Sequence, residues 1–248
     1  MKFASIIITH WAMDDARSDI MVKSITSLIE NIKYPYELII VDNGGSEEDS
    51  QFFMDLSNKE YLHTYIKNSH NMHFGYARNQ GIAVAQGDYI AIVDNDILHK
   101  KDWLSRCIEL LEKNTDNKWY GTPIDYPMKN DYNGNIRYRT GTFEDSGETI
   151  STNMRAGSNC FVIRYDDLKT IGGFPTHRIA GTKWTDKAVG DNYVAMVLPE
   201  GYVEDMGLRN GYALGDKKPV YLEVGGQRVY FNQDEFVAEN KRLQRRSL

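Results

Sequence analysis

The sequence has few features of an extracellular, membrane-spanning or nucleic-acid-binding protein. It contains only two cysteines, Cys107 and Cys160, which lie far apart and lack the spacing of metal ligands. We expect both to be small buried side chains in a reducing compartment. The formal net charge of −6 gives no electrostatic reason to expect nucleic acid as the main partner.

Long apolar runs are missing too. No stretch approaches the ~20 apolar residues that a membrane-spanning helix requires. The apolar run at residues 3–9 is too short for a signal peptide and turns polar at once. With 41% hydrophobic and 26% charged residues, the composition is that of a soluble globular protein, which we expect in the cytoplasm.

Short apolar stretches alternate with helical patterns in the first hundred residues. Strands are predicted at residues 3–9, 37–41, 61–66 and 89–93. Helices are predicted at residues 20–32, 46–56 and 75–85. This alternation predicts an α/β fold with a mostly parallel central sheet that helices cover on both faces.

The second half of the sequence is richer in polar and aromatic residues than the first. Helices are predicted at residues 102–113, 166–170, 191–198 and 234–246, a strand at 157–163, and a hairpin around Asn133-Gly134. The basic residues at the end of the last segment are typical of a solvated face. A weak contact with an anionic membrane surface is the alternative.

Asp94-Asn95-Asp96 follows the strand predicted at residues 89–93. In an open α/β sheet, ligands bind at the carboxyl ends of the strands. Carboxylates there suit Mg²⁺ or Mn²⁺, which usually bind through one or two carboxylates and the phosphates of a substrate. The competing interpretation is a solvated turn that ends the strand.

Other polar residues should meet at the same edge. Thr9 and Asp42 also end predicted strands, and Arg78 lies near a predicted helix start. A nucleoside diphosphate could use Asp42 or Thr9 for its base, Asp94 for its ribose, and Arg78 with a divalent ion for its phosphates. The glycine-rich fingerprint of dinucleotide-binding folds and the phosphate loop are absent, which disfavours a dehydrogenase or a kinase.

Several sequence blocks, in their order and spacing, resemble those of family 2 glycosyltransferases with the GT-A fold. The resemblance covers roughly residues 3–205. The blocks are residues 5–9, 37–44, 75–81, 87–96, 157–163 with 171–174, and 190–192 with 201–202.

The resemblance implies transfer of a sugar from a nucleotide-diphosphate sugar, UDP-linked by family expectation, to an acceptor hydroxyl with inversion. The acceptor could be a saccharide, a lipid-linked sugar or another hydroxyl compound. One GT-A domain is expected at residues 1–225, with a Rossmann-like nucleotide-sugar-binding half at 1–98, an acceptor half at 99–225 and a tail at 226–248. By the same resemblance, the donor-binding residues are Thr9, Trp11, Asp42, Asn43, Gly75, Arg78, Asn79, Asp94 and Asn95, and the Mn²⁺ or Mg²⁺ ligands are Asp96 and Asp94.

Asp191 stands where this family has its catalytic base, although Gly190 replaces the first residue of the usual acidic pair. An inverting transfer needs a carboxylate that takes the acceptor's proton. The alternative role for Asp191 is a helix N-cap. Related enzymes often complete the metal site with a late histidine, which this chain lacks after Tyr202; Asp205 is a candidate replacement, and an open site is the alternative.

Two other functions stay open at this stage. A sugar nucleotidyltransferase would also use a metal and a nucleotide-binding sheet, but needs a basic, glycine-rich loop after the first strand. A catalytically silent nucleotide- or carbohydrate-binding module is the second alternative. Trp184 could line the acceptor site or be a buried core residue.

Overall fold

The computed structural model describes residues 1–11, 15–115, 117–124, 139–154, 157–176, 180–206, 221–224 and 227–230. The chain divides into two compact units, Met1–Asp205 and Met206–Leu248. The first unit thus ends before the predicted domain boundary near residue 225. The hairpin predicted around Asn133-Gly134 and the helix predicted at residues 234–246 lie outside the described residues.

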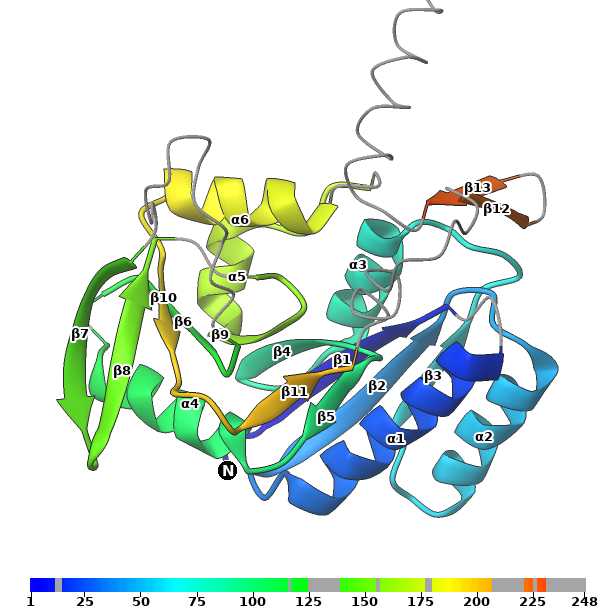
Figure 1. Cartoon of the computed structure of the whole chain (residues 1–248), viewed down its shortest axis with the longest axis horizontal. Helices are drawn as coiled ribbons and strands as arrows, with labels where there is room; N and C mark the ends of the chain where they lie inside the picture. The colour runs from blue at the N-terminus through cyan, green and yellow to red at the C-terminus, as the bar shows by residue number, and fades with distance from the viewer. Residues whose placement is uncertain are drawn as a thin grey trace, which may run out of the picture. The chain divides into compact units, whose positions relative to one another are not determined.

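Helices and strands alternate along residues 4–94 of the first unit (Figure 1). The described helices are α1 (Asp15–Asn31), α2 (Glu47–Asn58), α3 (Phe74–Val84), α4 (Trp103–Lys113), α5 (Tyr165–Ile171) and α6 (Ala180–Gly190). The described strands are β1 (Ala4–His10), β2 (Tyr36–Asp42), β3 (Thr64–Lys67), β4 (Tyr89–Asp94), β5 (Ile97–His99), β6 (Trp119–Thr122), β7 (Arg139–Asp145), β8 (Glu148–Asn153), β9 (Cys160–Arg164), β10 (Val194–Val197) and β11 (Val203–Asp205). In the second unit, β12 (Tyr221–Val224) and β13 (Gln227–Tyr230) form an antiparallel pair.

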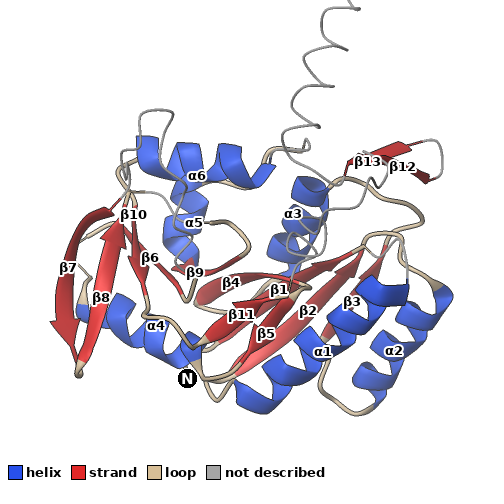
Figure 2. Cartoon of the chain, viewed as in Figure 1, coloured by secondary structure: helices blue, strands red, loops and turns tan. Residues whose placement is uncertain are grey.

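A nine-stranded sheet forms the centre of the first unit, in the order β3-β2-β1-β4-β9-β6-β10-β8-β7. Strands β3, β2, β1 and β4 pair in parallel, whereas β9 joins β4 in antiparallel orientation. Helices cover both faces of the sheet (Figure 2). The predicted α/β fold is confirmed, with the longest parallel part of the sheet in the first hundred residues.

The alternation of side chains along β1 explains why its middle residues, Ile6, Ile7 and Ile8, are all apolar. Ile6 and Ile8 belong to the core cluster that also contains residues of α1, α2 and α4. Ile7 points to the opposite face and joins a second cluster that contains residues of α5 and α6. A strand that is buried on both faces favours apolar side chains along its length.

Local signals fixed two helix ends as predicted. Ser46 and Asp49 form a capping box at the start of α2, where each side chain accepts a hydrogen bond from the other residue's backbone N–H. Gly172 follows the last residue of α5 with a φ of 90°, a conformation that glycine adopts without strain. Both cysteines are buried and free, and no described helix is long and apolar enough to cross a membrane.

The helix predicted at residues 191–198 is wrong. The helix, α6, comes earlier and ends at Gly190, and the apolar run after it forms β10, which pairs in parallel with β6. Alternate β10 residues belong to opposite cores, with Ala195 and Val197 in one and Met196 in the other. A short apolar run that is buried on both faces does not distinguish a strand from a helix by its periodicity.

Trp184 on α6 is a core residue. Its side chain is 1% exposed and stacks on Phe161 and Phe174, with ring centroids 4.7 and 5.3 Å away. Its Nε1 donates a hydrogen bond of 3.1 Å to the carbonyl of Gly172. The interpretation of Trp184 as an acceptor-lining residue is therefore wrong, and the buried alternative holds.

Candidate functional site

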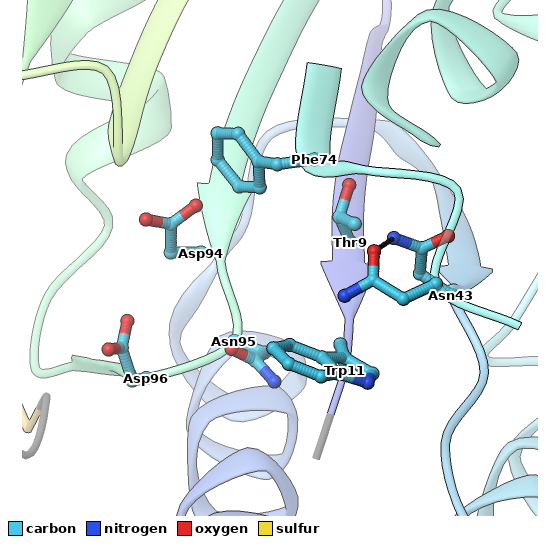
Figure 3. A pocket seen from close by; sticks show the side chains of 8 residues that line it. Thr9, Trp11, Asn43, Phe74, Asp94, Asn95 and Asp96 are labelled. Carbon is cyan, nitrogen blue, oxygen red and sulfur yellow. Dashed lines mark hydrogen bonds between the residues drawn. The ribbon is translucent and has the colours of Figure 1, made fainter. Parts of the chain in front are cut away.

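A cavity of about 170 Å³, open to solvent, lies where β1 and β4 end. Because these strands are parallel and in register, with Thr9 beside Asp94, their carboxyl ends meet at one edge of the sheet. In Figure 3, Asp94 and Asp96 lie on one side of the cavity and Thr9 and Asn43 on the other. The lining residues are Thr9, Trp11, Asn43, Asn71, Phe74, Asp94, Asn95 and Asp96.

Arg78 lies behind the cavity rather than in its lining. Its side chain is 1% exposed, and its Nη2 donates to Asp94 Oδ1 at 2.5 Å. The guanidinium carbon lies 3.5 Å from the ring centroid of Phe74 and 4.8 Å from that of Phe174. Burial lowers the pKa of Arg78 to about 10, although Asp94 acts against this shift. Arg78 therefore carries a positive charge at neutral pH and pairs with the Asp94 carboxylate from behind the cavity.

Two buried polar atoms at the site have no hydrogen-bond partner among the described residues: Thr9 Oγ1 and Arg78 Nη1. Buried polar groups in folded proteins are normally hydrogen-bonded. Thr9 Oγ1 belongs to a residue that lines the cavity, so a bound molecule can satisfy it. This favours a polar ligand at the strand edge.

Asp42 does not reach the cavity. Its side chain is fully buried and accepts hydrogen bonds from Gly45 N at 2.7 Å, Ser50 Oγ at 3.0 Å and Tyr65 Oη at 2.9 Å. The next residue, Asn43, lines the cavity instead. Successive side chains leave a strand end in opposite directions, so the predicted contact with a base moves from Asp42 to its neighbour.

A group of carboxamides fixes the orientation of Asn43 and Asn71. Asn43 Oδ1 accepts from Asn68 Nδ2 at 3.0 Å and from Met72 N at 2.9 Å, and Asn43 Nδ2 donates to Asn71 Oδ1 at 2.9 Å. Asn71 Oδ1 also accepts from His73 N at 2.9 Å. Since both carbonyl oxygens are engaged, the amide hydrogens of Asn71 Nδ2 are the groups that this end of the cavity offers to a ligand.

The sequence reasoning missed Asn71 and Phe74, which also line the cavity. Asn71 lies between β3 and α3, in a polar stretch without a periodic pattern. Phe74 is the first residue of α3, immediately before the block at residues 75–81. The position of Phe74 beside that block was the one available signal.

Gly75 and Asn79 serve the packing of α3. A Cβ on Gly75 would lie 1.8 Å from the carbonyl oxygen of Pro175, so no other residue fits there without a shift. Asn79 makes two hydrogen bonds with the backbone of Phe174, accepting from its N at 2.8 Å and donating to its O at 2.7 Å. Neither residue lines the cavity.

Asp191 is not at the cavity either. It follows the C-terminal end of α6, where its N–H donates to Lys187 O at 2.9 Å and its carbonyl accepts from Lys118 Nζ at 3.0 Å. The opposite end of α6 approaches α3, because a Cβ on Gly75 would lie 2.8 Å from Ala180 Cβ. The helix of 11 residues puts Asp191 about 15 Å from that end, and its place after a helix excludes the N-cap role.

The carboxylates at the cavity suit a divalent ion that a ligand's phosphates help to bind. Asp94 and Asp96 both line it, and one oxygen of Asp94 pairs with Arg78. Asp205 pairs with Ile97 between β11 and β5, which places it beside the Asp94–Asp96 turn. The described residues include no group of three or more His, Cys, Asp or Glu that could hold a metal without other ligands.

Comparisons with known proteins point to one family. The family model described as Glycosyl transferase family 2 matches residues 5–172. Glycosyltransferase AglE of Haloferax volcanii is 25% identical over 199 residues, which cover 78% of this chain and 63% of AglE. The glucosyl-dolichyl phosphate glucuronosyltransferase of the same organism is 25% identical over 112 residues, covering 45% and 35%. The chain thus spans less than two thirds of the length of either relative.

Solved structures share the fold. The crystal structure of S. aureus TarS 1-349 has a TM-score of 0.60 at 17% identity, covering 85% of this chain and 62% of that one. The crystal structure of GalNAc-T7 with UDP, GalNAc and Mn²⁺ has a TM-score of 0.61 at 14% identity, covering 82% and 43%. At these identities the likeness concerns the fold, and it agrees with the GT-A fold expected from the sequence.

Proposed function

Because this chain belongs to glycosyl transferase family 2, we propose that it transfers a sugar from a nucleoside-diphosphate sugar to an acceptor hydroxyl with inversion. The observation that carries the proposal is the cavity at the carboxyl ends of β1 and β4, with Asp94-Asn95-Asp96 in its lining and the buried charge of Arg78 behind it. Carboxylates for an ion and polar groups for a nucleotide meet there within one cavity.

UDP is the proposed nucleotide. TarS 1-349 has been crystallised with UDP-GlcNAc, and GalNAc-T7 with UDP. At the end of the cavity opposite Asp96, Asn71 offers amide hydrogens to a base carbonyl, and Thr9 offers its hydroxyl. Trp11 provides an aromatic face on which a base or a ribose can pack.

The diphosphate would lie toward Asp94 and Asp96, and Mn²⁺ or Mg²⁺ is the proposed ion. When bound, such an ion neutralises the negative charge that develops on the leaving diphosphate. Arg78 contributes a fixed positive charge behind Asp94, and this ion pair keeps the Asp94 carboxylate in one position for the ligand.

We do not assign Asp191 as the base that takes the acceptor's proton. Its location after α6 puts it too far from the cavity for the direct hydrogen bond that a general base makes. This observation favours a second candidate function, a nucleotide-sugar-binding module without transfer activity. Binding and turnover therefore have to be measured separately.

The test combines a thermal-shift screen with a turnover assay. Nucleoside diphosphates and their sugar conjugates are added with Mn²⁺, and UDP compounds should raise the melting temperature most, because a ligand that binds only the folded state stabilises it. Release of UDP from UDP-sugars, with and without candidate acceptors, then measures transfer. Stabilisation without release would identify the binding module, and no stabilisation by any nucleotide would contradict the proposal.

A further inference from the structure

A buried chain of hydrogen bonds runs from the start of α2 to the cavity through His10. His10 is the last residue of β1 and is fully buried. Its Nε2 lies 3.0 Å from Asp49 Oδ2, and its Nδ1 lies 3.0 Å from Asn95 Nδ2. Asn95 lines the cavity and Asp49 is the N3 residue of the capping box of α2, so His10 connects a structural element to the site.

The donor and acceptor roles in this series of hydrogen bonds follow from Asn95 at one end and Asp49 at the other. Asn95 Nδ2 carries only hydrogens to donate, so Nδ1 of His10 accepts and its ring proton is on Nε2. Nε2–H then donates to Asp49, which also accepts from Ser46 N at 3.2 Å. Burial acts to raise the pKa of Asp49, but hydrogen bonds from Ser18 and His10 outweigh it and lower this pKa. Asp49 is therefore a carboxylate acceptor, and it selects the Nε2–H tautomer.

The ring has no room to rotate away from these partners. Phe53 packs edge-on against it, with ring centroids 5.2 Å apart. On another side, a Cβ on Gly45 would lie 2.8 Å from Nε2, so the glycine is what leaves space for the imidazole. Because the side chain is fully buried, water does not compete for either nitrogen.

We infer that His10 is a positioning residue that fixes the side-chain amide of Asn95. With one Nδ2 hydrogen of Asn95 donated to His10, the carbonyl oxygen of Asn95 is held in a fixed position and can accept from a ligand in the cavity. A carbonyl oxygen accepts from a hydroxyl or N–H group, so this position suits a ribose hydroxyl or a base N–H of the bound nucleotide. The inference rests on the proposed nucleotide site.

Two substitutions of His10, each of which keeps one of its two hydrogen bonds, distinguish a positioning role from a purely structural one. In His10→Gln, the amide reaches the place of Nε2 and keeps a donor toward Asp49, but the acceptor toward Asn95 is lost. In His10→Asn, the side-chain oxygen occupies the place of Nδ1 and keeps that acceptor, but the bond to Asp49 is lost. Both variants lose packing against Phe53 and should lower the melting temperature.

UDP binding to the full chain, measured by isothermal titration calorimetry below the melting temperature of each variant, gives the readout. We expect His10→Gln to raise the Kd for UDP about tenfold and His10→Asn to change it less than about twofold, since one hydrogen bond to the ligand is at stake. In an Asn95→Ala background, His10→Gln should have no further effect on the Kd. Equal affinity of His10→Gln and the wild type, or an equal loss in both His10 variants, would overturn the inference.

The tautomer can be measured without any ligand. Two-dimensional ¹⁵N–¹H spectra of the histidine rings, with the His10 signals identified by their loss in His10→Asn, should show the neutral Nε2–H form. A proton on Nδ1 would contradict the role of His10 whatever the UDP affinity of the two variants. A wild-type protein that binds no nucleoside diphosphate would instead contradict the proposed function, with the tautomer still deciding the orientation of Asn95.

Discussion

The two halves of the first unit contribute unequally to the cavity. All of the residues that line it fall between Thr9 and Asp96, in the half built on parallel strands. The second half, from β5 to β11, contributes core residues such as Trp184 and a partly buried ion-pair network around Arg106. Within the described residues, ligand recognition is therefore concentrated in the first half, and we expect substitutions in the two halves to separate binding from stability.

The largest expected effect is a loss of stability without a loss of binding. Trp184→Ala removes a side chain that stacks on Phe161 and Phe174, and should lower the free energy of unfolding by about 3–5 kcal/mol. Urea denaturation measures this change, and Trp184→Phe is the milder control. The Kd for UDP of the folded variant should stay at the wild-type value; a weaker Kd would show that the second half supports the cavity directly.

Arg78→Met should reduce both stability and binding. The substitution leaves the Asp94 carboxylate without its buried partner, and since Asp94 is 27% exposed we expect a loss of about 2–3 kcal/mol, below the full cost of a broken buried pair. UDP affinity should fall as well. Arg106→Met is the matched control, because Arg106 pairs with Asp145 at 2.7 Å and Glu148 at 2.8 Å in the second half. It should destabilise the protein with no change in the Kd for UDP.

Asp96→Ala should weaken UDP binding about tenfold in the presence of Mn²⁺ and leave it unchanged in EDTA, because Asp96 is proposed to act through the ion. Calorimetric titration under both conditions gives the difference. Asp166→Ala, at a side chain that is 95% exposed, is the control for a lost surface charge. An equal loss in EDTA would argue against a ligand role for Asp96.

The smallest expected effect is that of Asp191→Asn. From its place beyond the end of α6, Asp191 should contribute nothing to transfer, so the rate of UDP-sugar turnover should stay within about twofold of the wild type. If Asp191→Asn binds UDP normally but loses transfer, the expectation that the second half contributes only to stability is contradicted. That result would assign the catalytic base to the second half, as the sequence resemblance implies.

The parallel strands of the first hundred residues and the main edge of the site were predictable because both depend on local patterns. Buried β-branched runs indicate strands such as β1 and β4, and polar residues directly after them, such as Thr9 and Asp94, must lie at the sheet edge. Asn43 was among the predicted donor-binding residues, but the burial of Asp42 could not be predicted, because a shift of one residue at a strand end reverses the direction of the side chain.

The remaining misses depend on tertiary contacts that a sequence pattern does not report. Asn71 is held at the cavity by a hydrogen bond from Asn43, which is distant in the chain. Asp191 was expected to begin a helix because the apolar run after it is too short to distinguish a helix from a strand, and pairing with β6 decided the outcome. The link of His10 to Asn95 and Asp49 appears only when β1, α2 and the end of β4 are assembled.

The close approach of Gly75 to Pro175 joins α3, whose first residue Phe74 lines the cavity, to the second half. Asn79 ties α3 to Phe174 by two backbone hydrogen bonds, and the rings of Phe74 and Phe174 both contact the Arg78 guanidinium. A shift of residues 172–175 is thus transmitted through α3 to Arg78 and on to Asp94. An event in the second half that moves this segment should therefore change the proposed nucleotide site, even though no described side chain from that half lines the cavity.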